Sequence, residues 1–256
     1  MLWYKSWLET RSRFLVGLAV VLLSVAGAVF AYPQVVKLLP LVPTIEVGGE
    51  LGRRIKEGAE LMRDYRGYVW SQWLRQSMTN MLSLFAVLLG TGGLLSQASG
   101  GGGALFTLSL PVSRNHLFGV RTATGLAELA ALAFVPPLLL PLLSPSVGHT
   151  YLFGDALVHG ACLFVAATVL FSMACLLSTV FSDVWRPALI VCGLASVLGI
   201  CEPFFGDLSR YSLFGIMNGE MYFRGGGLPW LGLIASAALS MAMLYAATRN
   251  IARQDF

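Results

Sequence analysis

The chain has 256 residues, of which 56% are hydrophobic and only 12% charged, and its mean hydropathy is +0.73. A soluble domain carries roughly a quarter of its residues as charged side chains, so this composition excludes an ordinary water-soluble protein and predicts apolar surface facing lipid. The net charge of +4 comes without a clustered basic face, which argues against a nucleic-acid-binding protein.

Stretches approaching the roughly 20 apolar residues that a helix needs to cross a bilayer recur along the chain. The fifth of them reaches that length only if it extends toward Phe205, which takes Glu202 to the interface. The connections show no strand alternation, and lipid tolerates no open sheet edge. The sequence therefore predicts one all-α domain, a polytopic membrane protein with six transmembrane helices at residues 14–32, 78–95, 122–143, 156–181, 187–205 and 228–248.

Two further segments are predicted to lie outside the spans. Residues 1–13 place Trp3 and Trp7 on one helical face, a pattern typical of an amphipathic helix lying along the membrane surface. Residues 33–75 form a large external connection, in which apolar residues recur at helical spacing and oppositely charged residues stand four apart.

The orientation follows from Lys and Arg in the short connections, which favour the cytoplasmic side. Basic residues precede the first span and follow the last one, and they occur between spans two and three and between spans four and five. Residues 144–155, between spans three and four, contain none. The pattern predicts cytoplasmic termini for a multi-pass protein of the plasma or inner membrane, although residues 33–75 carry seven basic residues among their acids.

No group of residues in the sequence predicts catalysis. The three histidines are scattered, and neither HExxH nor GxSxG occurs. The glycines at 100–103 lack the Lys-Ser/Thr pair of a phosphate-binding loop. The cysteines lie within or at the end of apolar runs without metal-ligand spacing; they are Cys162, Cys175, Cys192 and Cys201. We therefore expect a chain that is not an enzyme and holds no cofactor.

Glu128 is the one carboxylate well inside a predicted span. A charge at that depth is costly and needs a partner. One interpretation places Glu128 on a translocation path or gate. The other, which we favour, is a structural hydrogen bond to a polar neighbour such as Thr79 or Asn80.

A stripe of small residues runs along the sixth span at Gly232, Ser236 and Ser240. Small side chains let helices approach closely. The stripe predicts packing within the chain, and a seam between two copies is the alternative.

The segment Phe106-Thr107-Leu108-Ser109-Leu110-Pro111-Val112-Ser113-Arg114 lies between spans two and three. Pro111 stops an upstream helix, and Ser113 is suited to cap a new helix starting at Arg114. Apolar groups beside a basic residue at the membrane surface suit docking into a groove on a partner protein.

The same segment, followed by Arg121, resembles the signature of the type-2 ABC transporter permease family. The resemblance extends over nearly the whole chain, from the N-terminal interfacial helix through the six spans to the basic tail. In that family the segment forms a coupling helix that contacts an ATP-hydrolysing subunit. Residues 181–187 stand where such permeases have their second cytoplasmic connection.

The resemblance implies the membrane-spanning subunit of an ATP-driven ABC exporter. The implied partners are a separate ATPase, which binds ATP and magnesium, and a second permease protomer, identical or related, within the membrane lipid. The residues it assigns to coupling are Leu110, Pro111, Val112, Ser113 and Arg114, with Arg121, Asp183 and Arg186 in support. Two alternatives stay open: an ion-coupled secondary transporter, which ordinarily shows more intramembrane charge, and a non-transporting membrane assembly factor.

Overall fold

The computed structural model describes residues 2–39, 58–92, 113–202 and 212–253, and throughout these residues the regular structure is helical, with no strand. Four helices are long and apolar enough to cross a membrane: Leu2–Leu38, Asn115–Val147, Phe153–Leu177 and Trp230–Arg253. The chain is therefore a helical membrane protein, as its composition predicts.

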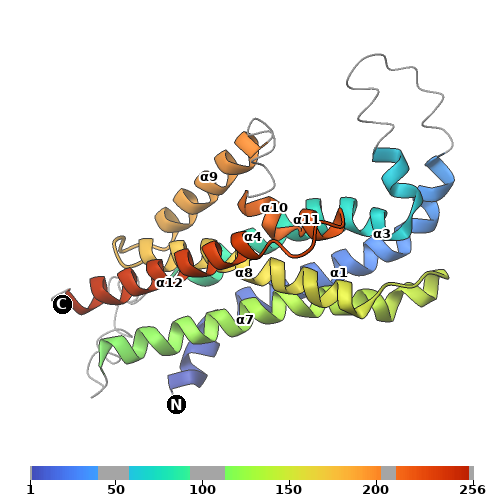
Figure 1. Ribbon diagram of the computed structural model, residues 1–256. Helices are drawn as coiled ribbons and strands as arrows, with labels where there is room; N and C mark the ends of the chain where they lie inside the picture. Colours follow the sequence, from blue (N-terminus) through green and yellow to red (C-terminus); the bar gives the residue numbers. More distant parts are fainter. Residues whose placement is uncertain (1, 40–57, 93–112, 203–211, 254–256) are drawn as a thin grey trace.

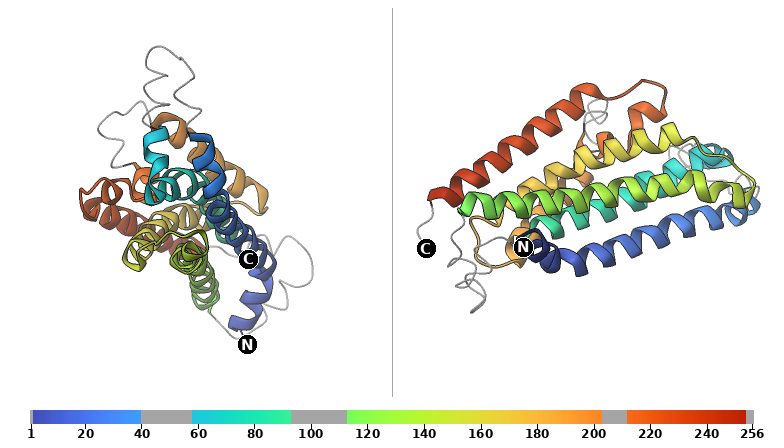
Figure 2. Two further views of the ribbon diagram at one scale, coloured as in Figure 1. Left: turned by 90° about the vertical axis from the view of Figure 1, so that its right-hand side faces the viewer. Right: turned by 90° about the horizontal axis from the view of Figure 1, so that it is seen from below.

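The helices form an elongated bundle (Figure 1). In chain order they are α1 (Leu2–Leu38), α3 (Tyr65–Tyr68), the π-helix η2 (Val69–Met78), α4 (Thr79–Gly90), α7 (Arg114–Leu143), the 3-10 helix η3 (Ser144–Val147), α8 (Phe153–Leu177), α9 (Trp185–Cys201), α10 (Leu213–Met217), α11 (Glu220–Phe223) and α12 (Trp230–Arg253). The beginnings of α1, α7 and α9 and the end of α12 lie at one end of the bundle, called here the terminal end (Figures 1 and 2). The opposite end is called the far end.

Helix α8 is the centre of the bundle and packs against α4, α7, α9, α10 and α12. Of its most apolar stretch, 67% is buried, against 22% for the corresponding stretches of α1 and α12. Two glycines permit this packing: a Cβ on Gly90 would lie 2.6 Å from the carbonyl oxygen of Phe171, and one on Gly125 would lie 2.8 Å from its ring. Only glycine allows α4 and α7 to approach α8 this closely.

The small-residue stripe of α12 faces α8. Ser236 and Ser240 are buried, and the Ser240 hydroxyl lies 3.1 Å from that of Thr168 on α8. A Cβ on Gly232 would lie 2.5 Å from the side chain of Ile216. The stripe therefore serves packing within the chain.

The helix boundaries differ most from those expected at three places. Residues 1–13 are not separate from the first span, because α1 runs unbroken from Leu2 to Leu38, and its first turns bend away from the rest (Figure 2). No proline or glycine interrupts those turns, and Ser6 and Thr10 are buried against the bundle.

The helix expected at 78–95 instead includes α3, η2 and α4, contiguous stretches of 4, 10 and 12 residues that end at Gly90. Helix α9 has 17 residues, and the expected extension to 205 passes Glu202 into residues outside the described part.

Candidate functional site

A groove of about 650 Å³ lies between α4, α9 and α10. Helix α9 leaves the bundle at an angle, as Figure 1 shows, and its small residues Ala195, Ser196 and Gly199 face the space. The groove is lined by Arg75, Thr79, Asn80, Ser83, Leu84, Val87, Cys192, Ala195, Ser196, Gly199, Ile200, Glu202, Phe214 and Asn218.

The groove is polar at one end and apolar at the other. Arg75, Glu202 and Asn218 line the end toward the far end of the bundle, whereas Val87 and Cys192 line the other. Along the helix that carries them, Arg75 and Val87 are separated by roughly 18 Å at the usual rise per residue. That length is more than half the thickness of a bilayer's hydrocarbon core.

Several polar groups of the groove are not used by the fold. The guanidinium of Arg75 lies 5.6 Å from the ring centre of Trp70 and forms no ion pair among the described residues. The side chains of Asn80 and Ser196 are exposed and make no hydrogen bond within that part of the chain. The groove thus presents a cation, an amide and a hydroxyl to whatever occupies it.

Neighbouring contacts hold the polar end in place. The indole N–H of Trp70 donates to the carbonyl oxygen of Asn218 over 3.0 Å, and the Trp70 ring stacks on Phe223 at 4.2 Å between centroids. The Ser212 hydroxyl donates to the carboxylate of Glu202. The contacts of Trp70 join η2 to the α10–α11 region, and the bond from Ser212 joins the end of α9 to the start of α10.

The π-helix η2 aims Arg75 into the groove, and no pattern in the sequence predicts it. The backbone N–H of Thr79, directly after η2, donates to the carbonyl of Leu74 five residues back, which is the π repeat. The hydroxyls of Ser77 and Thr79 also donate to carbonyls five residues back, those of Gln72 and Leu74. Stretches of π-helix occur frequently at functional sites.

A charged network joins three helices where α4 ends. Arg121 of α7 pairs with Glu9 of α1 at 3.0 Å, and its other terminal nitrogen donates to the carbonyl oxygen of Thr91 at 3.4 Å. Arg13 of α1 donates to the carbonyls of Leu88 and Thr91 at 2.8 and 3.2 Å. Two cations therefore satisfy the last carbonyls of α4, where the helix dipole is negative.

Glu128 belongs to the neighbourhood of this network and does not line the groove. It is buried, and one carboxylate oxygen lies 2.5 Å from the hydroxyl of Thr10. The partners expected from the sequence lie elsewhere: Thr79 donates to the carbonyl of Leu74, and Asn80 lines the groove. The expectation of a structural hydrogen bond agrees with this geometry, but its named partners were wrong, because Thr10 belongs to turns expected on the membrane surface.

The coupling residues expected from the resemblance are only partly within the described chain. Leu110, Pro111 and Val112 lie outside it. Ser113 caps α7, since its hydroxyl accepts from the backbone N–H of His116 at 3.3 Å, and Arg114 is the first residue of that helix.

Asp183 and Arg186 form an exposed ion pair of 2.9 Å at the start of α9. The carboxylate of Asp183 also accepts from the backbone N–H of Arg186 at 2.7 Å, a capping interaction. The beginnings of α7 and α9 lie at the same terminal end of the bundle (Figure 2).

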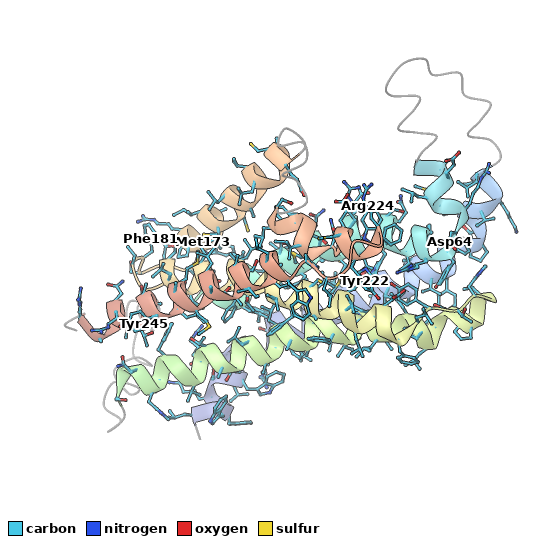
Figure 3. The ribbon with its side chains drawn as sticks, in the orientation of Figure 1. Asp64, Met173, Phe181, Tyr222, Arg224 and Tyr245 are labelled. Atoms are coloured by element: carbon cyan, nitrogen blue, oxygen red, sulfur yellow. The ribbon has the colours of Figure 1, made fainter. Side chains whose placement is uncertain are left out.

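A second polar cluster, at the far end, was not anticipated from the sequence. Asp155 is buried, pairs with Arg66 at 2.9 Å and accepts from the hydroxyl of Tyr222 at 2.8 Å. Figure 3 labels Tyr222 and Arg224 toward this end, away from Tyr245. The hydrogen bond to Asp155 and partial burial raise the pKa of Tyr222. The cluster ties α3 and α11 to the start of α8.

The described residues contain no group of three or more His, Cys, Asp or Glu side chains arranged to hold a metal ion. The fold and its two polar clusters define the class as a helical membrane protein with a groove between α4, α9 and α10. No family model, curated protein or solved structure matches the chain.

Proposed function

We propose that this chain is the membrane-spanning permease subunit of an ATP-driven ABC exporter. The observation that carries the proposal is the charged network at the end of α4. Residues 93–112, which hold most of the family-like segment, connect α4 to α7, and Arg121 ties the start of α7 to the carbonyl of Thr91 at the end of α4. A push on that segment would therefore act on both helices together.

In the proposed topology the protein crosses the plasma or inner membrane six times. Both of its termini lie in the cytoplasm. Besides the four long apolar helices, the continuous run of α3, η2 and α4 and the shorter α9 would supply the second and fifth spans. The terminal end of the bundle would then face the cytoplasm. Trp70 and Trp73 would lie near the outer interface, where tryptophans are enriched.

The proposed mechanism is alternating access, driven by a separate ATPase that binds ATP and magnesium. The ATPase would contact residues 110–114, with Asp183 and Arg186 at the start of α9 as a second contact. Because the ATPase would bind the two states of the permease with different affinities, its nucleotide cycle would shift the equilibrium between them. A second permease protomer, identical or related, would complete the complex, and the groove between α4 and α9 would be this chain's part of the path.

The test is co-purification of the chain with a candidate ATPase, followed by measurement of ATP hydrolysis in lipid nanodiscs. We expect hydrolysis that depends on both chains. Arg114→Glu should leave insertion and complex assembly intact while abolishing the stimulation of hydrolysis by the permease. Arg11→Glu, a charge reversal at an exposed position of α1, is the control. Unchanged stimulation in the Arg114 variant would contradict the coupling role.

Glu128 favours a second candidate function, an ion-coupled secondary transporter. Its carboxylate is buried in a membrane helix, and one of its oxygens has no hydrogen-bond partner. Transport by the chain alone, driven by an ion gradient without any ATPase and lost in Glu128→Gln, would support that candidate over the ABC permease. A third role, as an assembly factor, would give neither activity.

A further inference from the structure

We propose that the groove between α4 and α9 binds an amphiphile with an anionic headgroup, whose phosphate or carboxylate lies against Arg75 and whose apolar body extends toward Val87 and Cys192. As an assignment of cargo class, this inference rests on the proposed function. As a binding site, it rests on the groove alone.

The charge of the headgroup follows from Arg75. Its guanidinium has no carboxylate partner among the described residues and is held only over the ring of Trp70. Glu202, the other charged residue of the lining, keeps its negative charge, but its carboxylate accepts the hydroxyl of Ser212 and forms no ion pair with Arg75 in the described part of the chain. A cation with free donors at the polar end selects an anionic group, and a planar guanidinium binds phosphate or carboxylate through paired hydrogen bonds.

The rest of the headgroup site comes from uncharged polar groups. Asn218 is 4% exposed, its backbone carbonyl accepts from Trp70, and its side-chain oxygen accepts from the N–H of Glu220. Its amide nitrogen is left as a donor beside the groove. Asn80 and Ser196 add donors and acceptors on facing helices. Together these groups suit a headgroup that carries ester or hydroxyl oxygens beside its anion.

The apolar body follows from the other end of the lining. Leu84, Val87, Cys192 and Ala195 carry no charge and, apart from the weakly polar thiol, no hydrogen-bonding side chain. Leu84 and Ile200, at the margin of the groove, are 47% and 69% exposed, as expected for side chains that contact lipid. A ligand with its headgroup toward the far end and its chain deeper in the bilayer matches the order of these residues, and it would enter from the membrane.

The experiment uses the full chain in phosphatidylcholine nanodiscs that contain a small fraction of a lipid with a diazirine on its acyl chain. Three probes share that chain: phosphatidic acid, a free fatty acid and diacylglycerol. Mass spectrometry then locates the cross-links. We expect the two anionic probes to label peptides containing Val87 or Cys192 about tenfold more than diacylglycerol, the ratio expected for one charge-assisted hydrogen-bonded contact. The difference between the phosphate and the carboxylate probe identifies the preferred anion.

Arg75→Gln should lower labelling by the anionic probes to the diacylglycerol level. Arg249→Gln is the matched control, because Arg249 also lies over an aromatic ring, that of Tyr245 at 5.3 Å, but outside the groove. Ser196→Phe should block the groove, whereas Leu198→Phe, on the same helix but not in the lining, should not. All four substituted positions are exposed and lie outside the buried core. A monodisperse profile in size-exclusion chromatography, unchanged from the parent protein, checks that each variant folds.

Equal labelling by charged and neutral probes, or labelling confined to lipid-facing positions such as Met241, would overturn the proposal. So would cross-linking of Cys192 to a second copy of the chain in place of lipid, which would identify the groove as a subunit interface. None of these measurements uses an ATPase. Loss of amphiphile binding therefore leaves the coupling experiment to be judged separately, and failure of coupling leaves the binding result intact.

Discussion

Arg121 of α7 and Glu9 of α1 form an ion pair of 3.0 Å, although 112 residues separate them in the chain. Their side chains are only 15% and 28% exposed. Through this pair the first turns of the chain are bound to the helix that follows the proposed coupling segment. The pair thus makes the N-terminal turns of α1 part of the bundle.

Removing one partner of this pair should destabilise the protein. Glu9→Gln leaves the Arg121 guanidinium without its carboxylate, and we expect a loss of about 1–3 kcal/mol once partial exposure is allowed for. Thermal unfolding in detergent measures the loss. Arg11→Gln, at an exposed position two residues away, should change the midpoint little. Equal midpoints for Glu9→Gln and the parent protein would show that the pair contributes nothing to stability.

The hydrogen bond between Thr10 and Glu128 should contribute to the stability of the fold, because the carboxyl group is buried, out of reach of water that could replace the hydroxyl. Thr10→Val keeps the side-chain shape but removes the hydroxyl, and we expect a loss of about 1–3 kcal/mol from the unpartnered polar group. Glu128→Gln keeps an acceptor oxygen and should cost less. The prediction fails if Glu128→Gln lowers the midpoint of thermal unfolding more than Thr10→Val does.

The contact of α4 with α8 at Gly90 should tolerate no side chain. In Gly90→Ala the new Cβ would lie 2.6 Å from the backbone oxygen of Phe171, and backbone cannot move aside cheaply. We expect destabilisation by about 1–3 kcal/mol or more. Gly27→Ala, where nothing lies within 4 Å of the new Cβ, should be neutral or slightly stabilising. A Gly90→Ala protein as stable as the Gly27→Ala protein would refute the close packing.

The far-end cluster should make stability depend on pH in the alkaline range. Burial and the nearby Asp155 raise the pKa of Tyr151, and the hydrogen bond to Asp155 raises that of Tyr222. A raised pKa means that the folded state holds its proton more tightly than the unfolded state. Stability is therefore complete below the ordinary tyrosine value of 10.0 and falls as the pH rises above it.

Tyr222→Phe should flatten part of this alkaline decline, measured as the unfolding midpoint against pH. Tyr245→Phe is the control, because Tyr245 lies on an exposed face of α12 and outside the cluster. An identical pH profile for Tyr222→Phe and the parent protein would contradict the assigned hydrogen bond.

The sequence by itself determined the class of the protein and most of its helices, because the free energy of transferring a helix into lipid follows mainly from how apolar and how long its run of residues is. It also located the small residues of α12, since helical spacing places Gly232, Ser236 and Ser240 on one face. The six-span topology and the coupling segment stay predictions.

Only the tertiary structure decided which polar side chains meet. The partner of Glu128 is Thr10, the partner of Arg121 is Glu9, and Asp155 joins Arg66 to Tyr222. Each contact spans a long stretch of chain and depends on how α1, α7 and α8 pack, which local spacing does not encode. The groove likewise exists because α9 diverges from α4, and it carries a cation because η2 turns Arg75 toward it. Both are consequences of helix packing.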